Sequence, residues 1–147
     1  MTKLVQALFT GTFITFILDF FIFLGIKQNY IDLHEIDVYY NILFADHQNI
    51  YLFSFVSIIL GFIVTYLNKT RVSVIIIIFL SILAALTLVP SIGEGLGKDL
   101  LMQKNVELMS EKHRYYGDIY YEGRTKINFY DRELGKMIVL NKKDLIK

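Results

Sequence analysis

Three long apolar runs constrain the fold of this chain more than any other feature. They cover residues 4–26, 50–67 and 72–89. A helix rises about 1.5 Å per residue, so about 20 apolar residues are needed to cross the hydrocarbon core of a bilayer. Each run approaches or exceeds that length and lacks the polar face of a soluble amphipathic helix. We therefore predict three transmembrane helices, because an isolated strand in lipid would leave its backbone groups unpaired.

The composition agrees with a membrane location. Hydrophobic residues make up 54% of the 147 residues, above the roughly 45–50% of soluble domains, and the mean hydropathy is +0.48. The first run begins like a secretory signal peptide, with Lys3 ahead of apolar residues. It is longer than the roughly 7–15 apolar residues of such a peptide and no A-x-A cleavage site follows it. We expect an uncleaved membrane helix.

The positive charges predict an orientation. The short link at residues 68–71 carries two of them, whereas the loop at 27–49 has one lysine against four acids. Positive residues favour the cytoplasmic side of a membrane. We expect a multi-pass protein of a bacterial plasma (inner) membrane, with its N-terminus cytoplasmic and its C-terminus extracytoplasmic.

The segment after the third run predicts a hinge and then an amphipathic helix. Pro90 and the glycines that follow it disfavour a continuing helix. The stretch GEGLGKD does not fit a phosphate-binding loop, because Asp99 follows Lys98 where that motif needs Ser or Thr. Apolar residues between 101 and 109 recur at helical spacing. We expect a transmembrane region at 1–93, including the acidic loop at 27–49, then a hinge and helix at 94–114 and a β domain at 115–147.

The tail predicts a three-stranded antiparallel meander. The stretches DIYY, RTKINFY and KMIVL alternate apolar and polar residues, and Gly123 and Gly135 supply the turns. About 30 residues of sheet are too few to be stable alone. We expect the meander to pack on the amphipathic helix, on the loop at 27–49 or on another copy of the chain. The net charge of only +1 and the extracytoplasmic location argue against a nucleic-acid partner.

Asp19 is the one acid inside the first apolar run. A carboxylate at a helix centre costs about 2.5–3.5 kcal/mol on insertion scales, so it should face protein or water. Small and hydroxyl residues lie on its stripe, and the second run has a matching stripe, where such residues let helices approach closely. The candidate helix-packing or ion site is formed by Asp19, Thr12, Thr15, Ser57, Gly61 and Thr65. Asp19 is either a polar helix contact or an ion or proton site.

The acidic loop contains two histidines, His34 and His47, and four acids. Such side chains can bind divalent cations, but neither the H-E-x-x-H spacing nor a calcium loop is present. The chain has no cysteine and no G-x-S-x-G elbow. We therefore expect no metal, no cofactor and no catalytic residues.

Three classes of function follow. The first is a non-enzymatic membrane protein, such as an accessory subunit, that lies in the lipid bilayer, assembles with itself or a membrane partner and presents a small extracytoplasmic domain. The alternative is a subunit of an ion- or proton-linked transport complex that uses Asp19. A membrane enzyme that uses the loop histidines is the third.

Overall fold

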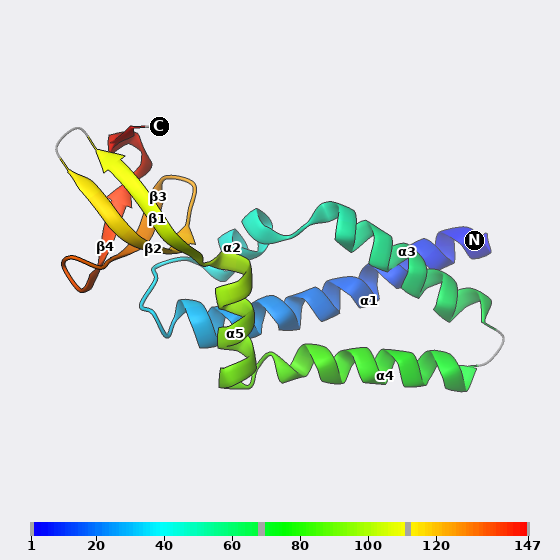
Figure 1. Cartoon of the computed structure of the whole chain (residues 1–147). Coiled ribbons are helices and arrows are strands. Elements are labelled where there is room, and N and C mark those ends of the chain that lie inside the picture. Colours follow the sequence, from blue (N-terminus) through cyan, green and yellow to red (C-terminus); the bar gives the residue numbers. More distant parts are fainter. Residues whose placement is uncertain (1, 68–69, 111–112, 147) are drawn as a thin grey trace.

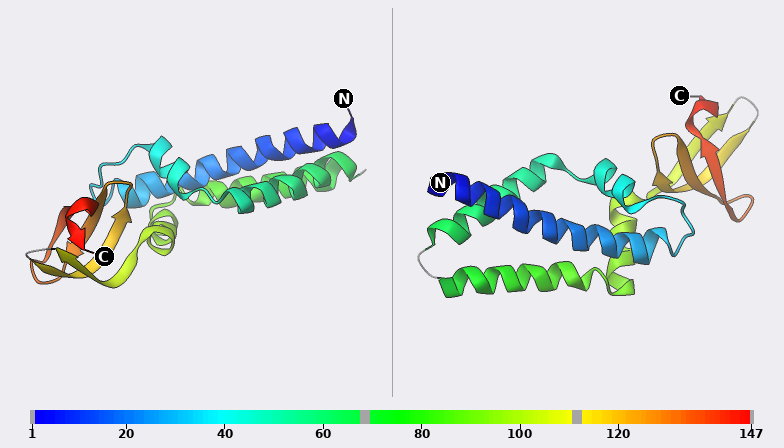
Figure 2. Two further views of the ribbon diagram at one scale, coloured as in Figure 1. Left: turned by 90° about the horizontal axis from the view of Figure 1, so that it is seen from above. Right: turned by 180° about the vertical axis from the view of Figure 1, so that it is seen from behind.

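The computed structural model describes residues 2–67, 70–110 and 113–146 of the chain. The chain forms a layer of helices with a small antiparallel sheet at one end (Figure 1). Viewed from above, the sheet lies beyond the end of the layer and does not cover its faces (Figure 2). The helices are α1 (Lys3–Ile26), its π-helical continuation η1 (Lys27–Ile31), α2 (Tyr40–His47), α3 (Ile50–Tyr66), α4 (Thr70–Leu86) and α5 (Pro90–Leu101).

The prediction of three transmembrane helices is wrong. Within the described residues, one helix is long and apolar enough to cross a membrane, namely Lys3–Ile31, which has 29 residues and a mean hydropathy of 2.1 over its most apolar window. The pairs α2 with α3 and α4 with α5 meet that criterion only when each is counted as one span, and they bend by 85° and 84°.

Local capping explains both bends. The side chain of Asn49 accepts hydrogen bonds from the backbone N–H groups of Tyr51 and Leu52, so α3 has to begin there. Pro90 occupies the first turn of α5, where its missing N–H costs nothing and its fixed φ suits a new helix. The proline therefore starts a helix at the position where a hinge was expected.

The helices α1 and α3 pack closely because glycines face the contact. A Cβ atom added to Gly11 would overlap the carbonyl oxygen of Ser57, and one added to Gly61 would overlap that of Ala7. Any larger residue at either position would push the two helices apart. Small residues at helical spacing permit this kind of approach.

Thr87 joins α4 to α1 at the bend before α5. Its hydroxyl lies 3.0 Å from the carbonyl oxygen of Phe21 and 2.7 Å from that of Ala84. Its own carbonyl accepts a 3.1 Å hydrogen bond from the side-chain amide of Asn29. The turn between α4 and α5 is therefore held against the C-terminal part of α1 and η1.

The sheet has five strands, so the predicted three-stranded meander is also wrong. The strands are β1 (Gln103–Ser110), β2 (Arg114–Glu122), β3 (Lys126–Asp131), β4 (Lys136–Asn141) and β5 (Leu145–Ile146). Their order is β4-β3-β2-β1-β5, and every neighbouring pair is antiparallel. A 3-10 turn, η2 (Lys142–Asp144), carries the chain from β4 to β5 at the opposite edge. The result is a half-barrel.

Within the described residues, most of α5, the whole of β1 and the first residue of β2 take the place of the hinge and amphipathic helix predicted at 94–114. In β1 the half-buried residues alternate with exposed ones, and Val106 and Leu108 pack against the barrel core. The same apolar residues fit a helical spacing in isolation, because short apolar runs satisfy both periods. Pairing with β2 decides the outcome. The half-barrel core is formed by Ile119, Ile127 and Phe129.

Candidate functional site

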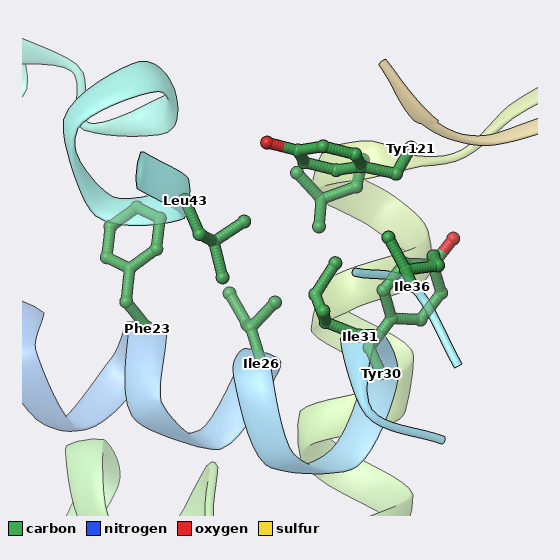
Figure 3. Packing of buried hydrophobic residues seen from close by; sticks show 8 residues of the cluster. Phe23, Ile26, Tyr30, Ile31, Ile36, Leu43 and Tyr121 are labelled. Carbon is green, nitrogen blue, oxygen red and sulfur yellow. The ribbon is translucent and has the colours of Figure 1, made fainter. Parts of the chain in front are cut away.

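The junction between the helices and the half-barrel is the candidate functional site. Side chains from α1, η1, the loop after it, α2, α5 and β2 meet in one buried apolar cluster. Figure 3 shows the side chains of Phe23, Ile26 and Leu43 next to one another, with the ring of Tyr121 on the side of the cluster away from Phe23. The cluster consists of Phe23, Ile26, Tyr30, Ile31, Ile36, Leu43, Leu101 and Tyr121. We call this set the junction cluster.

Tyr30 connects the end of the long helix to the half-barrel. It is fully buried, and its hydroxyl donates a 2.9 Å hydrogen bond to the carbonyl oxygen of Tyr120 in β2. The ring of Tyr120 stacks on that of Tyr30, with the centroids 6.4 Å apart. On its other side Tyr30 faces Gly97 of α5, where an added Cβ would overlap the ring.

His34 completes the aromatic contact. Its Nδ1 lies 2.7 Å from the carbonyl oxygen of Tyr30, and since a carbonyl only accepts, Nδ1 carries the proton in this hydrogen bond. The His34 ring lies 4.7 Å from the ring of Tyr120 between centroids. The loop after η1 is therefore tied to both the helix and the sheet.

An ion pair closes the outer side of the junction. The Nε atom of Arg124, in the turn between β2 and β3, lies 2.9 Å and 3.0 Å from the two carboxylate oxygens of Asp46 in α2. Hydrogen bonds from this guanidinium hold the pKa of the Asp46 carboxyl below its ordinary value. We call the pair the Asp46–Arg124 latch.

Tyr121 lies directly under the latch. Its ring is 5.5 Å from that of His47 between centroids, and burial raises the pKa of its hydroxyl. Among the described residues that buried hydroxyl has no hydrogen-bond partner. An unsatisfied buried polar group costs about 1–3 kcal/mol, so the apolar packing of Tyr121 has to outweigh this loss.

Asp19, on α1, lies against the turn between α2 and α3. Its carboxylate accepts a 3.0 Å hydrogen bond from the side-chain amide of Gln48, and within the described residues no hydroxyl of the small-residue stripe bonds to it. The neighbouring Phe20 carbonyl accepts a 3.1 Å hydrogen bond from the hydroxyl of Tyr40. Asp19 therefore lies beside a polar turn, and its hydrogen-bond partner is the amide of Gln48 and not one of the expected hydroxyls.

The structure brings some of the other candidate residues together and separates others. Thr15 and Ser57 are buried, and their hydroxyls lack a partner within the described residues. Gly61 faces Ala7 and Gly11. Thr12 is exposed and Thr65 half-buried, so neither shares the buried environment of Thr15.

The loop histidines do not form a metal site in the part of the chain that the structure describes, where no three His, Asp or Glu side chains are grouped for an ion. Nδ1 of His34 faces the Tyr30 carbonyl, and Nδ1 of His47 faces that of Leu43 at 3.3 Å. A hollow of about 520 Å³ opens beside the latch, lined by Val38, Ile42, Lys126, Asn128, Val139 and five further residues. Its lining includes neither histidine nor cysteine.

Sequence reasoning missed Tyr30, Thr87 and the Asp46–Arg124 latch. The two partners of the latch are separated by 78 residues, and those of the Tyr30 hydrogen bond by 90. No local pattern reports such pairs. The glycines at 93 and 97 were the available signal, because their spacing puts a side-chain-free stripe on one face of a helix.

No protein-family model, curated protein or solved structure matches this chain.

Proposed function

We propose that this chain is a non-enzymatic membrane protein that holds its half-barrel at one face of the bilayer and presents it to a second copy or to a membrane partner. The helical layer is the membrane-embedded part, with α1 and η1 as its spanning element. The half-barrel is the part that contacts the second copy or the membrane partner.

The surface of the helical layer supports the membrane location. Large apolar side chains are exposed along α1, α3 and α4, and large exposed apolar patches mark contact with a membrane or another protein. The exposed side chains include Phe9, Phe13, Phe16, Phe55, Ile58, Phe62, Ile75, Phe79 and Ile82. Lipid would cover these residues without any change in the fold.

The junction cluster is the single observation that carries the presenting role. Buried apolar side chains from six segments, with the hydrogen bond from Tyr30 to Tyr120, join the half-barrel to the end of the long helix. A flexibly tethered domain would not need a buried core at its attachment. The half-barrel is therefore held at a fixed position relative to the helices.

The outer edge of the half-barrel supports contact with another protein. Strand β4 is the last strand on its side of the sheet, and Val139 in its middle is exposed. An edge strand offers unpaired backbone groups to a neighbouring chain. The N-terminal ends of α1 and α4 lie at the end of the layer away from the sheet (Figure 1). They include Lys3 and Arg71, which favours a cytoplasmic N-terminus and an extracytoplasmic half-barrel.

Two measurements on the full chain test this proposal. The protein should stay in the membrane pellet after alkaline carbonate washing and be released only by detergent. In mild detergent, light scattering should show an assembly or a co-purifying membrane protein, and Val139→Asp should reduce it. Thr125→Asp, on the exposed turn between β2 and β3, is the matched control. Release by carbonate, or a monomer without partner in mild detergent, would contradict the proposal.

A second candidate is an ion- or proton-linked role for Asp19. The observation in its favour is that Asp19 pairs with the amide of Gln48 at a polar turn. Asp19→Asn should abolish flux with normal assembly if this is correct.

A further inference from the structure

Helix α5 presents three distinct faces, and one of them is packed. Gly93 lies against Thr87 and Asn29, and Gly97 lies against the ring of Tyr30. Leu101 at the end of this face enters the junction cluster. This glycine face fixes the direction of α5, because no larger residue could approach η1 so closely.

A second face, directly beside the first, is apolar and exposed. Ile92, Leu96 and Leu100 recur at intervals of four residues, so they form one stripe along the helix, and Val89 precedes them at the N-cap. Val89 is 43% exposed, Ile92 39% and Leu100 60%. Leu96 packs partly against the junction cluster. We call these four residues the α5 stripe.

The third face is polar. Ser91 and Lys98 are exposed on the side away from the stripe, and Lys98 forms a 2.5 Å ion pair with Glu94. Asp99 is exposed at the edge of the stripe, seven residues after Ile92. An apolar face beside a charged one is the pattern of helices that lie in the interface of a bilayer.

The direction of α5 fits the same location. The axis of α5 is bent by 84° from that of α4, and α4 runs along the layer beside α1 (Figure 1). A helix perpendicular to a membrane-embedded helix lies parallel to the membrane plane. Exposed apolar residues follow one another along the chain from the end of α4, at Ile82 and Leu86, through Val89 and into the α5 stripe.

We propose that α5 lies flat in the membrane interface, with the α5 stripe against the acyl chains and Lys98 toward the headgroups. This inference rests on the proposed membrane location of the helical layer, because α5 follows directly on α4 of that layer. The glycine face of α5 packs on Tyr30. The depth of α5 in the membrane interface therefore determines how far the junction cluster and the half-barrel lie above the membrane.

Tryptophan fluorescence can test this placement, because the chain has no native tryptophan. Single variants Leu100→Trp on the stripe, Ser91→Trp on the polar face and Phe13→Trp on α1 are compared in the full chain. Each is reconstituted in phosphatidylcholine vesicles whose acyl chains carry bromine at a shallow or a deep position. Circular dichroism of each variant establishes that it folds, and Ile92→Trp serves as a second stripe variant should Leu100→Trp fail to fold.

We expect Leu100→Trp to be quenched most by shallow bromine, as for a side chain about 5–10 Å below the headgroups. Phe13→Trp should be quenched most by deep bromine, and Ser91→Trp by aqueous iodide alone. If Leu100→Trp behaves like Ser91→Trp while Phe13→Trp is quenched by deep bromine, the placement of α5 is wrong and the membrane location stands. A blue-shifted Leu100→Trp without bromine quenching would mean that protein, such as a second copy, covers the stripe, and would also overturn the inference. Absence of bromine quenching in Phe13→Trp would remove the proposed function itself.

Discussion

The hydroxyl of Tyr30, at the end of the long helix, donates a 2.9 Å hydrogen bond to the carbonyl oxygen of Tyr120 in β2. The two residues are 90 positions apart in the chain. This hydrogen bond and the stacked rings of the two residues join the half-barrel to the end of the helical layer. Loss of this hydrogen bond should therefore destabilise both the helical layer and the half-barrel.

Tyr30→Phe should lower the free energy of unfolding by about 1 kcal/mol, because it keeps the ring and removes one hydrogen bond. Denaturant unfolding in detergent, followed by circular dichroism, measures this change. Tyr39→Phe is the matched control, because Tyr39 is 73% exposed and should have no effect. Equal stability of both variants would show that the hydrogen bond contributes nothing.

Two glycines of α5 should respond in opposite directions to the same substitution. Gly97→Ala should destabilise by about 1–3 kcal/mol, because its Cβ would overlap the ring of Tyr30. Gly95→Ala should stabilise by up to about 1 kcal/mol, because its Cβ would meet nothing within 4 Å and alanine favours helices. Thermal unfolding of the two variants side by side measures the difference. The close packing of α5 on η1 would be disproved by a neutral or stabilising Gly97→Ala.

The Asp46–Arg124 latch should weaken in acid. The folded-state pKa of Asp46 is lowered by Arg124, so its contribution is fully present above the unfolded pKa of about 3.9 and is lost as pH falls through the folded value. Stability of the wild type should therefore drop more steeply below about pH 4 than that of Arg124→Gln. Arg114→Gln is the control, because its ion pair with Glu107 is long, at 4.0 Å, and exposed. Denaturation midpoints measured between neutral and acid pH give the comparison, and parallel curves for wild type and Arg124→Gln would refute the latch.

Asp19 should tolerate an amide better than an alkyl side chain if it is a structural contact. Asp19→Asn can still bond to Gln48, whereas Asp19→Leu leaves that amide unpaired. Hydrogen bonds within membranes average about 0.6 kcal/mol, so the loss should be a weakening only. Gly61→Leu should be worst, because its side chain would meet the backbone of Ala7. Assembly in detergent and activity in cells rank the three variants. Loss of function in Asp19→Asn with intact assembly would instead identify an ion site.

Some elements could be predicted from the sequence and others could not, for physical reasons. The apolar runs form helices, as predicted from their length and composition. Their ends were misjudged, because the cap at Asn49 and the helix start at Pro90 interrupt runs that hydropathy alone treats as continuous. The strand β1 was missed because Val106 and Leu108 fit both periods until β2 pairs with them.

The candidate site shows the same limit. Asp19 stood out because its charge interrupts an apolar run, but its partner Gln48 is separated from it by 29 residues. No local sequence pattern distinguishes Tyr30, Asp46 or Arg124 from their neighbours. These residues make their contacts only when the half-barrel packs against the end of α1 and against α2.

The distance between the helical layer and the half-barrel tests the central claim most directly. The chain has no cysteine, so spin labels can be attached to Thr12→Cys on α1 and Glu133→Cys on the half-barrel, both exposed. Electron–electron double resonance in lipid vesicles then reports the distribution of distances between the labels. A single narrow distribution, broadened by Tyr30→Ala, is the result that a fixed half-barrel predicts. A broad distribution of distances in the labelled protein that keeps Tyr30 would show that the half-barrel moves freely, and it would contradict the account.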